Sequence, residues 1–158
     1  MKQAVATTTI FKAILAFTIL FSAFLAVAIT YNRVYKLKNE TIFILEKYEG
    51  VNNKSLNIIN NYLDNSGYNI KGRCETDEYG VVDLTNNIYE KAQTNKAYYY
   101  CLNYYCDGNS CSLNNTHIFY KIKLFFKFNL PFLGDLATFK ITGDTKAIKY
   151  YNVNQKLS

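Results

Sequence analysis

The sequence predicts an α+β fold in which a long N-terminal transmembrane helix precedes a short helix packed on a small antiparallel β-sheet. Three observations predict this fold: an uncharged apolar run near the start, helical spacing of apolar residues after it, and a period of two along the second half. We therefore expect a transmembrane anchor over residues 1–31, a helical stem over residues 32–66, and a small antiparallel β domain with a disulfide loop over residues 67–158.

The apolar run extends from Ala13 to Tyr31 and contains no charged residue, proline or glycine, with Lys12 and Arg33 on either side. A helix of about 20 apolar residues spans the ~30 Å hydrocarbon core of a bilayer. The run therefore predicts a single-pass protein of the cell membrane, with membrane lipid as one partner. A cleaved signal peptide is the alternative, because residues 26–28 (Ala-Val-Ala) form a small-x-small cleavage site.

Helical spacing continues beyond the apolar run, and no glycine or proline interrupts the chain before Gly50. We expect the anchor to run on as one long helix that ends near Gly50. A second helix is expected from a cap at Asn53 or Ser55 to Asn65, followed by a turn at residues 66–67. The apolar positions that should pack on the sheet are Val34, Leu37, Ile42, Leu45 and Tyr48 in the first helix and Leu56, Ile59, Tyr62 and Leu63 in the second.

A period of two marks the chain from Tyr68 onwards. Strands are expected over residues 69–74, 79–84, 97–105, 118–130, 137–142 and 146–153, with a polar stretch that holds a helical turn at 85–95 and a tight turn at 143–144. The last three strands should form a meander covered by the helices. In the longest strand, Tyr120, Ile122, Leu124, Phe126 and Phe128 alternate with Lys121, Lys123, Phe125, Lys127 and Asn129. This alternation predicts one buried face and one face in contact with water.

All four cysteines lie in the second half of the chain, at Cys74, Cys101, Cys106 and Cys111. An even number of cysteines in a small domain beyond a membrane segment predicts two disulfides and an oxidising compartment. Three pairings are possible, and one of them joins Cys106 to Cys111 across a loop and Cys74 to Cys101. Free thiols in a reducing cytoplasm are the alternative. Basic residues on both sides of the apolar run leave its orientation open, and the cysteines favour a C-terminal domain outside the cytoplasm.

The sequence offers no catalytic constellation, and we expect a protein that is not an enzyme. His117 is the only histidine, and no second candidate base accompanies it. The densest acidic group, Glu75, Asp77 and Glu78, lacks the alternating ligands of a calcium loop and is interpreted as a solvated turn. The cysteine spacing differs from that of zinc and redox sites, so we expect neither a metal nor a cofactor. The net charge of +6 comes from dispersed lysines, and no nucleic-acid partner is expected.

The layout of the chain, a long helix that is apolar and then amphipathic followed by a small sheet with a disulfide loop, resembles the pilin-like proteins. The nearest likeness is to minor pilins and pseudopilins of Tad-type (Flp) pili and related machines. Residues 128–134 (FNLPFLG), followed by residues 139–145 (FKITGDT), are similar to the strand–Pro–Gly–strand ending of such proteins. The run from Ala13 to Tyr31 lacks the glutamate that pilins usually carry there, and only Ala4 or Ala6 stands where a processing site is expected.

The resemblance implies a non-enzymatic structural component of a pilus, secretion or conjugation assembly. Its partners would be other membrane or pilus-assembly proteins, or further copies of this chain. The alternative function is a surface adhesin or ligand-binding module, in which the tyrosine-rich strand stacks on sugars. The tyrosines concerned are Tyr98, Tyr99, Tyr100, Tyr104 and Tyr105, and the bland interpretation is that they fill both faces of the sheet.

Overall fold

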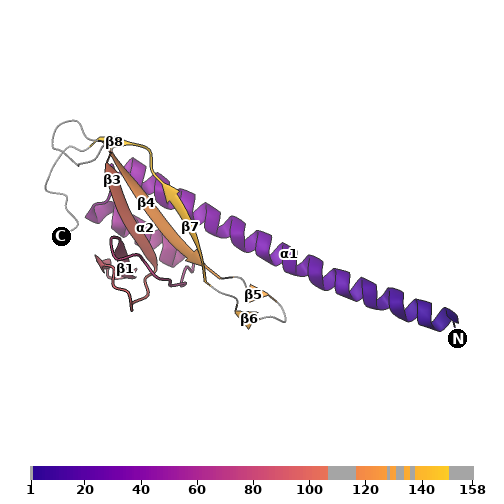
Figure 1. The fold of residues 1–158 in the computed structure, drawn as a ribbon. Helices are drawn as coiled ribbons and strands as arrows, with labels where there is room; N and C mark the ends of the chain where they lie inside the picture. The colour runs from indigo at the N-terminus through magenta and orange to yellow at the C-terminus, as the bar shows by residue number, and fades with distance from the viewer. Residues whose placement is uncertain (1, 107–116, 128, 131–133, 136–137, 150–158) are drawn as a thin grey trace.

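The computed structural model describes residues 2–106, 117–127, 129–130, 134–135 and 138–149. Figure 1 shows both helices on one face of the sheet, with the first half of the long helix extending beyond the sheet. The predicted α+β class is confirmed. The elements are α1 (Lys2–Lys47), α2 (Asn53–Asn65), β1 (Tyr79–Asp83), β2 (Ile88–Lys91), β3 (Tyr100–Cys106), β4 (His117–Phe126), β5 (Asn129–Leu130), β6 (Gly134–Asp135), β7 (Phe139–Asp144) and β8 (Ile148–Lys149).

The long helix α1 is continuous and ends where its sequence predicts. After Lys47 the backbone turns through Glu49 (φ 56°) and Gly50 (φ 110°), and the Gly50 amide donates to the Leu45 carbonyl at 2.8 Å. A side chain at Gly50 would be strained, because its Cβ would lie 2.7 Å from Cε2 of Tyr120. The turn therefore needs glycine both for its backbone angles and for the close approach of β4.

The short helix α2 covers the predicted residues, but its N-terminal cap is Asn52 rather than Asn53 or Ser55. The Asn52 side chain accepts hydrogen bonds from the amides of Lys54 and Ser55, and the Ser55 hydroxyl accepts one from the Asn52 amide. This reciprocal capping box satisfies donors that the first turn of a helix leaves unpaired. The helix ends in the predicted turn, where Gly67 has a φ of 68°.

The main sheet has the strand order β2-β1-β3-β4-β7, with β8 paired to β4 and every pairing antiparallel. The predicted turn at residues 143–144 is wrong, because both belong to β7 and pair with Ile122 and Lys121. The chain does not turn back on β7. Instead, the Thr145 amide donates to the Tyr120 carbonyl at 2.9 Å, and the Thr145 hydroxyl accepts from the Tyr120 amide at 3.0 Å. The chain then continues to β8 along the same edge of β4.

Three other expectations about the strands need correction. The strand predicted over residues 69–74 is reduced to one bridge between Gly72 and Tyr98, and the ring of Phe125 lies against Gly72 where a Cβ would be. The stretch 85–95 contains the strand β2 in place of a helical turn. The longest strand ends at Phe126, and the short strands β5 and β6 pair with each other beyond it. The last predicted strand is described only as far as Lys149.

The core lies between the sheet and the two helices. Its buried members come from α1 (Val34, Leu37, Ile44, Leu45), α2 (Leu56, Ile59, Leu63) and the facing sides of β3 and β4 (Tyr100, Leu102, Tyr120, Ile122, Leu124, Phe126). The Tyr68 hydroxyl joins the loop after α2 to this sheet. It accepts from the Phe125 amide at 2.8 Å and donates to the Tyr99 carbonyl at 2.9 Å.

The opposite face of β4 is not the water-exposed surface that its lysines predicted. Lys123 and Phe125 are both buried, with 4% and 3% of their surface exposed, whereas Lys121 is half-buried. A second, smaller cluster covers this face. It contains Cys74, Ala92, Tyr98, Cys101 and Phe125. The chain between Gly72 and Glu78 therefore lies over the middle of the sheet on the side away from the helices.

Candidate functional site

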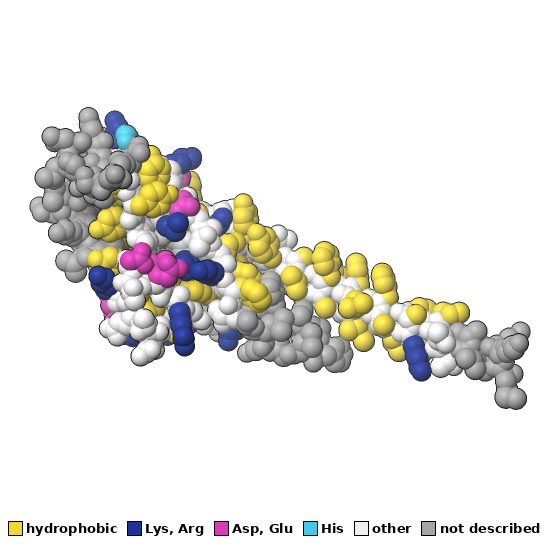
Figure 2. Space-filling model, viewed as in Figure 1, with side chains coloured by type: hydrophobic (Ala, Val, Ile, Leu, Met, Phe, Trp, Pro, Cys, Tyr) yellow, Lys and Arg dark blue, Asp and Glu magenta, His cyan; other side chains and the backbone are white. Residues whose placement is uncertain are grey.

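The first half of α1 has the length and composition of a membrane span. Among the residues that the structure describes, α1 is the one helix long and apolar enough to cross a membrane, and none of its most apolar window is buried in the protein. Figure 2 shows apolar side chains along this part of the helix. From Lys12 to Arg33 the rise is about 31 Å, at 1.5 Å per residue, which matches a ~30 Å hydrocarbon core.

The polar side chains inside this segment bond to its own backbone. The hydroxyls of Thr18, Ser22 and Thr30 donate to carbonyls three or four residues earlier, at 2.8 to 2.9 Å. Such bonds satisfy hydroxyl groups that would otherwise be costly to place in hydrocarbon. The segment therefore carries no polar group at these positions that needs water.

Aromatic and basic side chains gather where α1 enters the sheet domain. The rings of Tyr31 and Tyr35 stack at 6.2 Å and are both about half exposed, and Nζ of Lys38 lies 4.4 Å from the centre of the Tyr35 ring. The Arg33 guanidinium donates to the Ser66 carbonyl at the end of α2. Amphipathic rings and cations are typical of the boundary between a bilayer and water.

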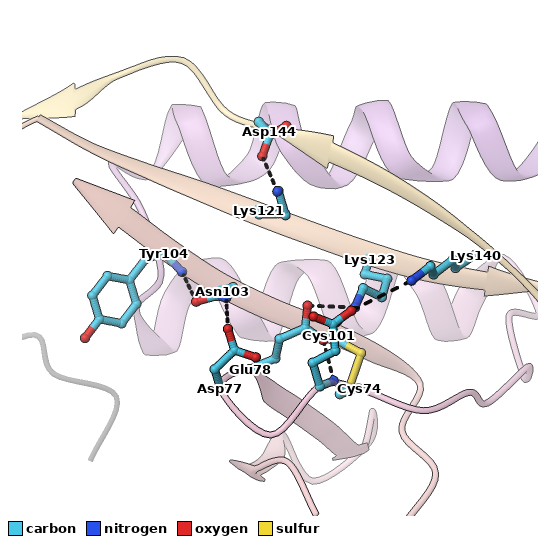
Figure 3. A network of polar contacts seen from close by, with 11 residues as sticks. Cys74, Asp77, Glu78, Cys101, Asn103, Tyr104, Lys121, Lys123, Lys140 and Asp144 are labelled. Carbon is cyan, nitrogen blue, oxygen red and sulfur yellow. Dashed lines mark hydrogen bonds and ion pairs between the residues drawn. A yellow bond between two sulfur atoms is a disulfide. The ribbon is translucent and has the colours of Figure 1, made fainter. Parts of the chain in front are cut away.

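A disulfide and a buried ion pair lie together on the face of the sheet away from the helices (Figure 3). Cys74 is bonded to Cys101 in β3, with 5.6 Å between their Cα atoms. Lys123, which stands opposite Cys101 in the β3–β4 register, places Nζ 2.7 Å from Oε1 of Glu78 and 3.0 Å from Oε1 of Glu75. The Glu78 side chain is also buried, and its second oxygen accepts the Glu75 amide at 2.9 Å.

The interpretation of the acidic group as a solvated turn is therefore wrong for Glu78 and right only for its exposed neighbours. Burial alone would disfavour the charge on Lys123, but its hydrogen bonds to Glu78 and Glu75 outweigh that effect and raise the pKa of Lys123. The hydrogen bond from Lys123 lowers the pKa of Glu75. No sequence pattern predicts this cluster, because Lys123 is separated from Glu78 and Glu75 by 45 and 48 residues.

The same cluster has the appearance of a metal site but not its chemistry. Cys74, Glu78 and Cys101 bring one ligand atom each within 4.8 Å of one another. Both sulfurs are bonded to each other, so neither is a thiolate, and the Glu78 carboxylate already faces the ammonium of Lys123. The cluster is arranged to hold β3, β4 and the chain before β1 together.

The remaining candidate residues are spread over the sheet. His117 opens β4, half-buried, and pairs with Lys149 in β8. Cys106 is disulfide-bonded, and Cys111 lies outside the described residues. Tyr98 and Tyr100 are buried, so the tyrosine-rich strand serves mainly as core.

Two of the five tyrosines remain on the surface, at the end of β3 far from the membrane segment. Tyr104 and Tyr105 are 43% and 45% exposed, and the Tyr105 ring stacks on that of Phe119 in β4 at 5.2 Å. Nζ of Lys121 lies 5.8 Å from the centre of the same Tyr105 ring. Tyr105, Phe119 and Lys121 thus form an exposed aromatic surface with a cation beside it, and Tyr104 lies on the opposite face of the strand.

Comparisons with protein families, with characterised proteins and with solved structures give no match. What can be said of function therefore comes from the residues and geometry of this chain.

Proposed function

We propose that the chain is a single-pass membrane protein that holds its sheet domain outside the cytoplasm and serves as a non-enzymatic structural component of a pilus-like or secretion assembly. The observation that carries the proposal is that the two halves of one unbroken helix have different surroundings. The first half of α1 is apolar and exposed, and its second half packs Val34, Leu37 and Leu45 against the sheet and α2. The same element thus serves as anchor and as core.

The oxidised cysteines support an external domain. A bond between Cys74 and Cys101 requires an oxidising compartment to persist, and Cys106 is also disulfide-bonded. The pilin-like part of the proposal is supported by the layout, in which a long helix backs a small antiparallel sheet. In this arrangement the apolar half of α1 would pack against partner helices within the bilayer.

The proposal is tested by changing the shape of the apolar helix without changing its polarity. In the variant with Ala16, Ala23 and Ala26 each replaced by leucine, the added side chains should prevent close approach of a partner helix. Two differently tagged copies of the full chain are expressed together and recovered from solubilised membranes, together with any membrane proteins bound to them. We expect recovery of the partners to fall at least about tenfold.

A matched control carries three isoleucine-to-leucine changes in the same segment, at Ile14, Ile19 and Ile29. This variant keeps the volume and polarity of the helix and should co-purify as the unchanged chain does. Undiminished recovery of partners by the alanine-to-leucine variant would contradict assembly through α1. Intact mass of the native protein under non-reducing conditions tests the external location, because reduced cysteines would place the domain in the cytoplasm.

The alternative function, a surface adhesin, has one observation in its favour, which is the exposed aromatic surface of Tyr105 and Phe119. Aromatic faces with a neighbouring cation are suited to stacking on sugar rings. Binding of the full chain to immobilised glycans that is lost in Tyr105→Ala and kept in Tyr35→Ala, which changes an equally exposed tyrosine, would favour this alternative. No binding by the unchanged chain would count against it.

A further inference from the structure

The end of the sheet domain that lies nearest to the apolar half of α1 is defined by the short hairpin of β5 and β6 together with Lys127, Phe139 and Lys140. Figure 1 shows this hairpin beside α1, on the side of the sheet towards the N-terminus. β5 contacts α1 directly. We refer to this set of residues as the membrane-proximal end.

The level of the membrane-proximal end along α1 follows from the surroundings of Gly143 in β7. A Cβ there would lie 2.5 Å from Cδ1 of Ile42 and 3.0 Å from Cδ of Lys38, so this point of β7 is level with the turn of α1 between Lys38 and Ile42. Phe139 lies four residues earlier in the same strand, about 13 Å at 3.3 Å per residue. That distance equals about nine residues of helix. Figure 1 shows that β7 runs in the same direction as α1. About nine residues before the turn between Lys38 and Ile42, Phe139 is therefore near the level of residues 29–33, where the apolar run ends.

The hairpin continues past that level. Phe126 and Phe139 are the last pair between β4 and β7, and their rings stack at 5.7 Å. β5 and β6 lie in the connection that follows Phe126 and precedes Phe139, and they pair with each other beyond the end of the sheet. Since Arg33 marks the end of the apolar run, a bilayer around that run has its surface at the height of the hairpin.

The composition of this connection fits a lipid surface better than water. Between Lys127 and Lys140 the sequence has one acidic residue, Asp135, and no basic residue. Phe139 is 41% exposed, which is unusual for a phenylalanine at the end of a sheet that is otherwise well covered.

The charges around the hairpin are suited to an anionic surface. Arg33 and Lys36 on α1 are exposed, as is Lys140 at 62% of its side chain, and Lys127 is half-buried. The nearest carboxylate to Lys140 is Glu75, 3.8 Å away and itself 65% exposed, so that ion pair leaves the lysine available. Cations near an anionic leaflet are attracted by about 1 kcal/mol each.

We propose that the membrane-proximal end docks on the anionic lipid surface from which α1 emerges, with Lys127, Phe139 and Lys140 in the headgroup region. The sheet domain then lies against the membrane instead of standing clear of it. This inference rests on the membrane span in the proposed function. Its occupant is the lipid surface of the same membrane, and a second copy of the chain is the rival that the experiment must separate.

The test uses the full chain in lipid nanodiscs that contain phosphatidylcholine with phosphatidylglycerol and a lipid nitroxide-labelled at its headgroup, at one copy per disc. Paramagnetic broadening of backbone amide signals in NMR reports which residues approach the lipid surface. The Phe139 amide should be strongly broadened, and the amide of Phe43 should not be. Phe43 is exposed at 55% and lies on α1 about 18 Å beyond Tyr31.

Two variants then test the docking contacts. Lys127→Gln combined with Lys140→Gln should lower the equilibrium constant between docked and undocked sheet domain on anionic discs about 30-fold. Each lysine contributes about fivefold to that constant. Phe139→Ser should reduce the broadening at residue 139 to the level of the Phe43 amide. Phe43→Ser, the matched control, removes an equally exposed phenylalanine and should change nothing.

The possible outcomes distinguish failure of the docking from failure of the proposed function. Broadening of amides between Ala13 and Tyr31 without broadening at Phe139 would keep the membrane span and overturn the docking. Broadening at Phe139 only in discs that hold two copies would also overturn it, in favour of contact between copies. Extraction of the chain from membranes by alkaline carbonate would contradict membrane insertion of α1, and with it the proposed function.

Discussion

The buried ion pair of Lys123 and Glu78 allows a quantitative test of how the outer face of the sheet is held. Replacing Lys123 with methionine keeps most of the aliphatic stem but removes the ammonium that lies 2.7 Å from Glu78. The carboxylate of Glu78, buried with 4% of its side chain exposed, then remains without its cation. An unpaired buried charge is among the costliest single changes to a folded protein.

The expected cost can be estimated from the contacts that remain. Breaking a buried pair by removing one partner costs about 3–5 kcal/mol. Glu78 keeps one hydrogen bond, from the Glu75 amide at 2.9 Å, which places the expected loss near the lower limit. We therefore expect Lys123→Met to lower the free energy of unfolding by about 3 kcal/mol, a factor of more than about one hundred in the ratio of folded to unfolded protein.

The assay is thermal unfolding of the full chain in detergent micelles without reductant, followed by near-ultraviolet circular dichroism of the tyrosines. A matched control is Lys121→Met, two residues earlier on the same face of β4. Lys121 is 44% exposed and lies 4.0 Å from Asp144, so its replacement should cost about 0–1 kcal/mol. The double variant Lys123→Met with Glu78→Met should recover much of the loss, because it removes the stranded charge as well.

Acid titration gives an independent check on the same cluster. The hydrogen bond from Lys123 lowers the pKa of Glu75 below its ordinary 4.5, so the stability this group contributes is present above pH 4.5 and is lost as the pH falls through the lowered value. Lys123→Met should abolish that part of the acid dependence. Equal melting temperatures for Lys123→Met and Lys121→Met, or no recovery in the double variant, would refute the reasoning.

Three further predictions concern other parts of the fold. Replacing Cys74 and Cys101 with alanine opens a link between residues 27 apart and should lower stability by about 3.5 kcal/mol in the chain-entropy description, measured by the urea midpoint of the full chain in micelles. Asn52→Ala removes the cap of α2 and should cost about 1 kcal/mol in the same titration, whereas an unchanged midpoint would contradict the capping role. Burial raises the pKa of Tyr68 and Tyr100 above 10.0, so their contribution to stability is present below pH 10.0 and lost as the pH rises above it. The phenolate absorbance of Tyr100, taken as the difference between the unchanged chain and Tyr100→Phe, should therefore appear together with unfolding, and its appearance well below the unfolding transition would contradict this burial.

The helices were predictable because their signals are local. The absence of glycine and proline before Gly50, and the spacing of apolar residues after the apolar run, determine α1 without reference to the rest of the chain. The end of α2 at residues 66–67 follows from the same kind of signal. Only its cap was misplaced, at Asn53 or Ser55 instead of Asn52, because all three residues have suitable side chains and the choice depends on the preceding turn.

The outer face of the sheet was not predictable, because it depends on residues far apart in sequence. The alternation along β4 identifies the face towards the helices but cannot show that Lys123 is covered by the chain around Glu78, 45 residues earlier. The path after β7 depends on the two hydrogen bonds between Thr145 and Tyr120, which no turn propensity of Gly143 and Asp144 reveals. Local glycine–aspartate pairs favour turns, and here the pairing with β4 prevails.

The unbroken course of α1 has a mechanical consequence for whatever the sheet domain meets. No glycine or proline interrupts residues 2–47, so the helix offers no hinge between the apolar run and the sheet domain. Each residue of an α-helix turns it by about 100°. One extra residue inserted between Tyr31 and Arg33 would therefore rotate the whole sheet by about 100° around the axis of the apolar run, leaving its internal packing intact. The direction in which the β2 and β7 edges face is thus set by the helical register of a segment that lies outside the sheet domain.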